Sequence, residues 1–342
     1  MLQRRWASML DRAKPLSVSV VICAYTSERW GMLLDVIESV RNQTLAPDQI
    51  LVVIDHNEDL YERLIEIVDD VTVVESTGLP GLSGARNTGV GLADSDIIAF
   101  LDDDAEAAPD WLERLLALYD DPDVLGVGGK VVPLWESGRP GYFAEELDWI
   151  VGCSHRGLPR VASEVRNVIG ANMSFRLEVL RQVGGFNQSL GRKGTMPLGC
   201  EETEICIRSR MGSPGSRIVY EPAALVHHHV PASRGTWRYM MSRSWSEGLS
   251  KAQVSQLVGH KRALGPERRY VRNVLPRAVF TGLTSWGRDG SPDGLGRAGA
   301  VIAVLACTAA GYFRGRRLQH WTGPEEEDQV LVVTGGQWRE VQ

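Results

Sequence analysis

The sequence predicts an α/β protein with a mostly parallel central sheet and helices on both of its faces. Apolar runs of strand length alternate with amphipathic stretches of helix length from Ser17 to about Lys130. Several of these runs are apolar at successive residues, as strands are when helices cover both faces of a parallel sheet. Prolines, which interrupt regular structure, fall in the connections: Pro47, Pro80, Pro109 and Pro122.

The elements of this first part follow in a regular order. Strands are expected in SVSVVICAY (17–25), QILVVID (49–55), VTVVES (71–76), DIIAFLD (96–102) and VLGVGGKVV (124–132). Helices are expected between them, in 29–43, 61–68, 84–93 and 109–121. Pro109 suits the first turn of the last helix because its missing N–H has no partner to lose there.

After Pro133 the alternation breaks down into an aromatic and glycine-rich stretch, 135–157, which predicts a loop with short elements. A strand at 168–176, a helix at 176–183, a helix at 201–211 and short strands at 217–220 and 224–228 then continue the same domain. A helix is also expected from Thr236 to Lys251.

Two further apolar stretches, Leu275–Trp286 and Ala298–Phe313, lie near the C-terminus. Neither reaches the roughly 20 apolar residues that a membrane span needs, so contact with a membrane surface is favoured over a span. A helical pair that packs on the domain is the alternative. We therefore expect an amphipathic or flexible segment (1–16), the α/β domain (17–232), a basic helical extension with possible membrane contact (233–321) and an acidic tail (322–342).

Charge is distributed unevenly along the chain, whose formal net charge is -6. Between Pro231 and Trp321, Lys and Arg outnumber Asp and Glu by 15 to 4. A basic region favours a phosphate-rich partner or an anionic membrane surface, but the acidic remainder makes nucleic acid a poor fit. The five cysteines show no CxxC spacing, and no secretory signal begins the chain. A cytoplasmic location is therefore expected, with the cytoplasmic face of a membrane as a possible site.

Three consecutive aspartates, Asp102, Asp103 and Asp104, end the apolar run at 96–101. The carboxyl edge of a parallel sheet is where open α/β sheets bind ligands. Alternate residues of an extended segment point the same way, so Asp102 and Asp104 are spaced to hold one divalent cation. The alternative is a solvated acidic turn that caps the helix beginning near Pro109.

Other strand ends are expected at the same edge. Ala24 and Tyr25 end the first strand, with Glu28 just beyond it, and Asp55 ends the second. Asp55 can accept a hydrogen bond from a nucleobase, and Ala24 and Tyr25 can line the base slot. Arg86 lies in a glycine-rich segment, GLSGARN (81–87), whose backbone N–H groups precede a helix and suit a diphosphate.

Two candidate groups lie later in the chain. Glu201 and Glu202 begin a helix, where they serve either as caps or, functionally, as a general base (Glu202) and an acceptor-binding or loop-steadying group (Glu201). His227, His228 and His229 alternate faces if extended, so at most two can face one site. One imidazole can complete a cation's ligand shell.

Together these segments resemble a family-2 glycosyltransferase of the GT-A fold. The matching segments run in the family's order over about two thirds of the chain: CAYTSERW, IDHN, GLSGARN, FLDDDA, VIGANMSFR, VGGFNQSLG, GCEETEICIR and VHHHVP. The resemblance implies an inverting transfer from a nucleotide-activated sugar, usually a UDP-sugar, with Mg²⁺ or Mn²⁺ bound through the DxD motif. The acceptor would be a hydroxyl of a lipid-linked or polysaccharide glycan.

The resemblance also implies roles for individual residues. Nucleotide-binding positions are Ala24, Tyr25, Glu28, Asp55, Arg86, Asp102 and Asp103. The metal positions are Asp104, Asp102 and His228, and Asp103 is expected to be the bystander of the aspartate triplet with respect to the metal. The catalytic pair is Glu202, the base, with Glu201.

The chain departs from the family's pattern at two positions. The usual Glu-Asp pair is Glu201-Glu202, and the glycine before it is Cys200. The segment 230–252 is similar to a subgroup that adds glucuronic acid to a sugar on dolichyl phosphate, which would make the basic extension an acceptor-docking surface. A metal-dependent nucleotidyltransferase and a noncatalytic module that binds nucleotide sugars or membrane surfaces stay open as alternatives.

Overall fold

The computed structural model describes residues 15–191, 198–289, 292–317, 330–334 and 337–341. The predicted N-terminal segment, apart from its last two residues, and the acidic cluster at 325–328 lie outside the described residues. The remaining predictions can be compared with the structure directly.

The described strands are β1 (Val18–Ala24), β2 (Gln49–Ile54), β3 (Thr72–Glu75), β4 (Ile97–Asp102), β5 (Ala105–Ala107), β6 (Val124–Trp135), β7 (Ser163–Val165), β8 (Asn172–Arg176), β9 (Arg217–Val230), β10 (Val330–Thr334) and β11 (Gln337–Val341). The α-helices are α2 (Trp30–Arg41), α3 (Glu58–Ile65), α4 (Leu82–Leu92), α5 (Trp111–Leu116), α6 (Leu177–Gln182), α7 (Glu201–Gly212), α8 (Trp237–Val258), α9 (His260–Ala263), α10 (Gly265–Arg269), α11 (Leu275–Asp289) and α12 (Pro292–Arg317). Short 3₁₀ segments are η1 (Ser27–Arg29), η2 (Ala117–Asp120), η3 (Glu145–Val151) and η4 (Ala232–Gly235), and η5 (Tyr270–Val274) is a π-helical turn.

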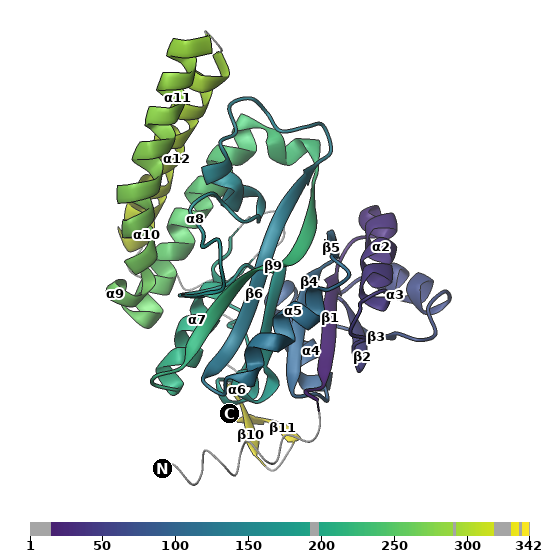
Figure 1. Ribbon diagram of the computed structural model, residues 1–342. Coiled ribbons are helices and arrows are strands. Elements are labelled where there is room, and N and C mark those ends of the chain that lie inside the picture. Colours follow the sequence, from purple (N-terminus) through teal and green to yellow (C-terminus); the bar gives the residue numbers. More distant parts are fainter. Residues whose placement is uncertain (1–14, 192–197, 290–291, 318–329, 335–336, 342) are drawn as a thin grey trace.

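The central sheet has nine strands in the order β3-β2-β1-β4-β8-β6-β9-β5, with β7 paired to β9 (Figure 1). Strands β1 to β4 pair in parallel, as do β6 and β9. Strands β5, β7 and β8 pair antiparallel to their neighbours. The sheet is therefore mixed rather than purely parallel. For β8 the departure arises because this strand follows the long segment 136–171, which contains only η3 and the short strand β7, instead of following a βαβ crossover.

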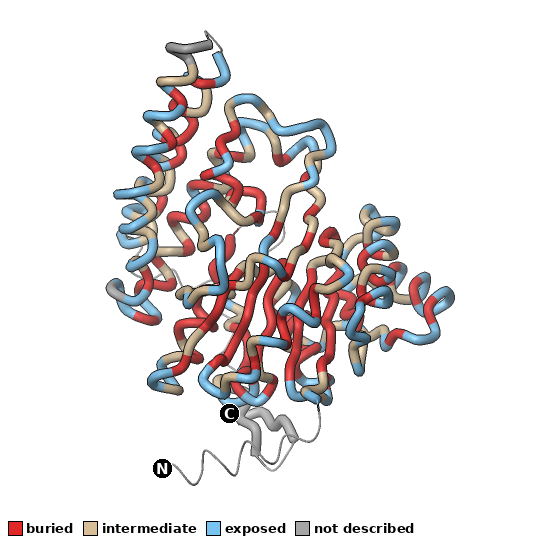
Figure 2. Tube along the Cα trace, viewed as in Figure 1, coloured by how far each residue is buried: buried red, intermediate tan, exposed pale blue. Residues whose placement is uncertain are grey.

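Both faces of the sheet are buried (Figure 2). Alternate residues of β1 contribute to two cores, with Val20 and Ile22 on one face and Val21 and Cys23 on the other. Residues of α2, α3 and α5 complete the first core, and residues of α4, α6 and α7 complete the second. This arrangement confirms the prediction of a sheet covered on both faces.

One long strand, β9, replaces the two short strands predicted at 217–220 and 224–228. It pairs with β6 along its length, with a register shift between Gly129 and Lys130 of β6 that absorbs the residues separating the two predicted strands. Beyond this shift, His228 of β9 pairs with Ala105 of β5. The register shift therefore places the histidine-containing end of β9 beside β5, the short strand that follows the aspartate triplet.

The C-terminal extension is helical, as predicted. Helices α11 and α12 stand beside α8 at one side of the molecule (Figure 1). A Cβ at Gly248 would overlap the Thr308 carbonyl, and one at Gly311 would overlap the Trp245 carbonyl, so α8 and α12 meet backbone to backbone. Only residues without side chains permit this approach.

Helix α12 is longer than the predicted apolar stretch. Its 26 residues include a window with mean hydropathy 1.5, of which 33% is buried. By length and composition alone it qualifies as a candidate membrane span, which corrects the prediction that neither C-terminal stretch is long enough. Helical residues on both sides of Ala298–Phe313 supply the extra length. The tail strands β10 and β11 pair with each other.

Candidate functional site

One cavity of about 1760 Å³ opens at the carboxyl ends of β1, β2 and β4 and continues to α8 and the C-terminal helices. It brings together ten of the eleven predicted site residues, drawn from widely separated segments: Ala24, Tyr25, Asp55, Arg86, Asp102, Asp103, Asp104, Glu201, Glu202 and His228. Glu28 is exposed on η1 and does not line this cavity. Its nucleotide role stays a prediction.

The metal corner consists of Asp102, Asp104 and His228, whose ligand atoms lie within 4.8 Å of one another. The Nε2 atom of His228 is 3.2 Å from Oδ1 of Asp104, and both side chains are buried. Burial alone would raise the pKa of Asp104, but His228 and the nearby Arg29 and Arg234 outweigh it and hold this pKa well below its usual range. Asp104 is therefore ionised in the folded protein.

The donor set of this corner fits a divalent cation. Two carboxylates and one imidazole suit Mn²⁺ or Mg²⁺, which prefer oxygen ligands and tolerate a nitrogen. The neighbouring Asp103 is 3% exposed, and its Oδ2 atom has no hydrogen-bond partner. Burial and the charge of Asp104 raise the pKa of Asp103 to about 7. So much buried carboxylate favours an added cation.

The histidine triplet separates as its alternation predicts. His228 turns inward to Asp104, whereas His229 pairs with Glu106 at 2.8 Å. His227 belongs to the same alternate face as His229 and is also only partly buried. The structure thus places His228, the residue chosen by resemblance, at the metal corner.

Arg29 is a site residue that the sequence did not reveal. Its Nη1 atom lies 2.5 Å from Oδ1 of Asp103 and 2.9 Å from Oδ2 of Asp104. It follows the first strand directly, where the segment CAYTSERW drew attention to Glu28 instead. One basic residue among 37 gives no signal by itself, although its place after a strand end could have suggested it.

The second strand end supports a nucleotide slot. Oδ2 of Asp55 accepts a hydrogen bond from the backbone N–H of Gly81 at 2.8 Å, and Oδ1 lies 2.8 Å from Nδ1 of His56. Tyr25 is 49% exposed, and Asn57 donates to its carbonyl at 3.0 Å. An exposed aromatic residue close to ordered polar groups suits a planar base.

Arg86 connects the metal corner to the start of α7. Its Nη1 atom lies 2.9 Å from Oε1 of Glu201, and its Nη2 atom lies 3.3 Å from Oδ1 of Asp102. Nη2 also donates to the Gly170 carbonyl at 3.2 Å, and the side chain is fully buried. The guanidinium therefore holds two site carboxylates in position, a role the sequence did not suggest beside its predicted nucleotide contact.

Replacing Arg86 with Met should destabilise the protein by about 3 to 5 kcal/mol, because the buried Glu201 and the partly buried Asp102 lose their shared cation. Urea unfolding of the full chain measures this change. The control is Arg114→Met, which removes an exposed partner of Asp110 and should cost less than about 1 kcal/mol. Equal losses in the two variants would contradict the bridging role.

The two glutamates differ in their surroundings. Glu201 is buried and gives one oxygen to Arg86, whereas Glu202 is only partly buried and contacts Thr203 at 3.5 Å. Burial, followed by the charge of Glu201, raises the pKa of Glu202 to about 8. Glu202 is thus the carboxyl with the raised proton affinity that a general base requires.

This pKa also sets a stability prediction. Glu202 keeps its proton to about pH 8 when folded but loses it near its ordinary pKa of 4.5 when unfolded. The folded state is therefore destabilised as pH rises through this window. Glu202→Gln should raise the stability relative to wild type by about 4 to 5 kcal/mol near pH 9 and by almost nothing near pH 4.

Thermal melts across this pH range test the prediction, with the exposed Glu66→Gln as a matched control that should show no such trend. A constant difference between Glu202→Gln and wild type at all pH values would contradict the raised pKa.

Cys200 precedes this pair with φ 73°, a left-handed backbone that glycine adopts more readily. The glycine expected from the family resemblance suits this conformation. The Cys200 side chain is nevertheless buried, with its thiol 3.5 Å from Oε1 of Glu247. Cys200 therefore adopts a backbone conformation that favours glycine, while its buried side chain gains a contact with Glu247.

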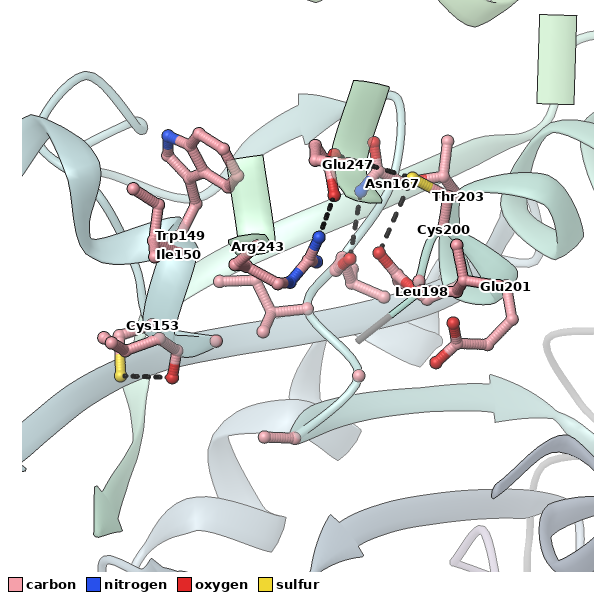
Figure 3. A pocket seen from close by; sticks show the side chains of 18 of the residues that line it. Trp149, Ile150, Cys153, Asn167, Leu198, Cys200, Glu201, Thr203, Arg243 and Glu247 are labelled. Atoms are coloured by element: carbon pink, nitrogen blue, oxygen red, sulfur yellow. Dashed lines mark hydrogen bonds and ion pairs between the residues drawn. The ribbon is translucent and has the colours of Figure 1, made fainter. Parts of the chain in front are cut away.

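Arg243, Glu247 and Lys251 of helix α8 line the same cavity and form a network of ion pairs, here called the α8 ion-pair network. Glu247 lies 2.8 Å from Arg243 and 3.0 Å from Lys251, and Lys251 lies 2.7 Å from Glu267 of α10. Arg166 also contacts Glu267, at 2.6 Å. In Figure 3, Arg243 and Glu247 lie between the η3 side chains and the start of α7. The spacing of four residues was visible in the sequence, but it is common on exposed helices.

Comparison with known proteins agrees with this geometry. Residues 19–184 match the family pattern of glycosyl transferase family 2. The chain is 35% identical over 307 residues to the glucosyl-dolichyl phosphate glucuronosyltransferase of Haloferax volcanii, covering 88% of this chain and 96% of that protein. It is 31% identical over 275 residues to the pre-mycofactocin glycosyltransferase of Mycobacterium tuberculosis, covering 79% of this chain and 52% of that protein.

Two solved structures share the fold. One is the mannosyltransferase PcManGT from Pyrobaculum calidifontis in complex with GDP-Man and Mn²⁺. Its TM-score is 0.55 at 17% identity, and the match covers 91% of this chain and 94% of the mannosyltransferase chain. The other is GalNAc-T7 with UDP, GalNAc and Mn²⁺, with TM-score 0.51 at 16% identity; the match covers 77% of this chain and 58% of the GalNAc-T7 chain. These similarities confirm the GT-A architecture. With a relative matched over nearly its whole length and a cavity that joins the aspartate corner to the glutamate pair, the chain belongs to glycosyl transferase family 2.

Proposed function

We propose that this glycosyltransferase moves a sugar from a nucleoside-diphosphate sugar, with UDP favoured, to a hydroxyl of a lipid-linked or polysaccharide glycan. The observation that carries this proposal is one cavity that contains both the Asp102, Asp104 and His228 corner and Glu202. The name of the Haloferax volcanii relative supports a glucuronosyl donor and a dolichyl phosphate-linked acceptor.

The donor would lie along the carboxyl ends of β1, β2 and β4. Asp55 and the Tyr25 ring would hold the base, and Arg86 would keep Asp102 and Glu201 in place. The Asp102, Asp104 and His228 side chains would hold Mg²⁺ or Mn²⁺, which neutralises charge on the diphosphate. Asp103 would take part through its pairing with Arg29 at the same corner.

Glu202 would accept the proton of the acceptor hydroxyl, and that oxygen would attack the anomeric carbon on the face opposite the diphosphate. The bond from that carbon to the diphosphate breaks as the new glycosidic bond forms, so configuration inverts. Glu201, held by Arg86, would orient the acceptor or steady the start of α7. After the transfer, the proton of the acceptor hydroxyl is on the Glu202 carboxyl group.

The location proposed for this reaction is the cytoplasmic face of a membrane. Helices α11 and α12 expose large apolar side chains, with Phe280 at 68%, Ile302 at 58% and Phe313 at 60%. Arg314, Arg316 and Arg317 end α12. Exposed apolar groups beside clustered arginines suit an anionic membrane surface.

Product analysis tests the proposal. The full chain is incubated with UDP-glucuronate, Mn²⁺ and a synthetic glucosyl lipid, and the released nucleotide and the product anomer are identified. Release of UDP with inverted configuration is expected. Release of pyrophosphate would instead indicate a nucleotidyltransferase, and saturable UDP binding without turnover of any sugar donor would indicate a binding module.

A further inference from the structure

Part of the cavity lining is apolar and is not used by the sugar-transfer steps; this part is called the apolar compartment. It combines side chains of η3 with side chains of the C-terminal helices. The side chains that define it are Ile150, Val274, Leu275, Val304, Leu305 and Phe313. Contact between water and this apolar lining is unfavourable. A hydrocarbon ligand that covers the lining would remove it from water and so bind favourably.

Direct contacts between η3 and the C-terminal helices fix the walls of this compartment. The Tyr270 hydroxyl donates a hydrogen bond to the Glu146 carbonyl, which joins the turn before α11 to η3. The Tyr270 ring also packs edge-on against His155 with a centroid distance of 4.8 Å. A Cβ at Gly157 would lie 2.9 Å from Val274. These contacts hold η3 and the loop after it in a fixed position relative to the start of the C-terminal helices.

The compartment also reaches the outside of the molecule. Leu305 and Phe313 line it while being 37% and 60% exposed. Both lie on α12, the helix whose outer surface also exposes Ile302. A ligand can thus enter from the side on which the apolar helices face their surroundings.

The charge of one exposed lining residue, Arg269, indicates the class of ligand. Arg269 lines the cavity and is exposed, and it takes part in no ion pair within the part of the chain that the structure describes. Two other basic residues of the lining, Arg243 and Lys251, are already paired with Glu247. An anionic group beside Arg269 would therefore meet an unneutralised guanidinium, which suits a phosphate. A free phosphate would leave the apolar lining without a role.

We infer that this compartment binds the isoprenoid chain of a phosphate-bearing lipid acceptor, with the phosphate on Arg269 and the chain between η3 and α12. The inference rests on the proposed function, since it supplies the acceptor for the same cavity. It adds that the acceptor enters laterally, between the C-terminal helices and η3, and that α12 forms part of the acceptor site.

Farnesyl phosphate, used below its micelle-forming concentration with the full chain, tests the inference by titration calorimetry. Leu305→Glu should weaken its binding at least about tenfold, because a charge then lies in the apolar lining. The matched control is Ile302→Glu on the same helix, which is exposed but does not line the cavity and should change affinity less than about twofold. Circular dichroism melts confirm that both variants fold.

A second matched pair tests the phosphate contact. Arg269→Gln should weaken farnesyl phosphate about tenfold, whereas Arg268→Gln, one residue away and not lining the cavity, should leave it unchanged. Farnesol, which lacks the phosphate, should bind wild type more weakly than farnesyl phosphate. Equal effects of the paired variants, or equal affinities for the two probes, would overturn the inference.

The same samples are titrated with UDP and Mn²⁺ to separate the two proposals. Retained nucleotide binding without farnesyl phosphate binding would overturn the lipid compartment and leave the sugar-transfer proposal standing. Farnesyl phosphate binding as expected, with no metal-dependent binding of UDP, would overturn the sugar-transfer proposal and leave the lipid-binding compartment standing.

Discussion

Asp104→Asn is expected to lower sugar transfer by at least about a thousandfold. The substitution keeps the shape of the side chain but removes the charge that faces His228, Arg29 and Arg234. Mn²⁺ affinity should fall by about a hundredfold or more, since even outer-shell partners of metal ligands often contribute ten- to a hundredfold. Electron paramagnetic resonance of free Mn²⁺ measures this affinity without any turnover.

Asp103→Asn is the control for metal affinity, because Asp103 is the triplet member outside the Asp102, Asp104 and His228 cluster. Its Mn²⁺ affinity should stay within about tenfold of wild type. If the two variants lost Mn²⁺ equally, the triplet would act as a diffuse acidic patch. Retained turnover in Asp104→Asn would contradict the assigned metal corner.

Glu202→Gln is expected to reduce turnover by about a hundred- to ten-thousandfold, the range typical of a lost general base. Binding of UDP with Mn²⁺ should persist, since Glu202 is not part of the Asp102, Asp104 and His228 cluster. Wild-type turnover should rise with pH toward a plateau above about pH 8, because only the ionised carboxylate accepts a proton and its pKa is raised to about 8.

The conservative variant Glu202→Asp should restore much of the turnover, as the related family pair is Glu-Asp, and should keep a rising pH profile. Glu202→Gln should lose that profile. Full turnover in Glu202→Gln would mean that the acceptor is already ionised, for example a lipid phosphate, and would remove the hydroxyl-acceptor version of the proposal.

The sequence predicted the part of the fold that local patterns encode. Alternating cores on β1 and the strand-end position of Asp102 follow from apolar runs and the side-chain period of two. The direction of β8 does not follow, because strand direction depends on how a long connection crosses the sheet. The joining of two predicted strands into β9 depends likewise on pairing with β6.

The candidate site shows the same division. The family resemblance, together with the positions of strand ends, selected eleven residues, and the structure brings ten of them into one cavity. The sequence could not show that Arg29 would turn to Asp103, or that Arg86 would bury itself between Asp102 and Glu201. Such contacts join residues far apart in the chain, where single-residue patterns carry no information about partners.

The α8 ion-pair network connects the C-terminal extension to the sheet domain. Lys251 and Glu267 are partners across two helices of the extension, and Arg166 belongs to the segment before β8. A chain ending at the predicted boundary, residue 232, would lose the Glu267 partner of Arg166 together with the α8 side of the cavity. We therefore expect the extension and the sheet to unfold together, in one cooperative transition, across the predicted boundary at residue 232.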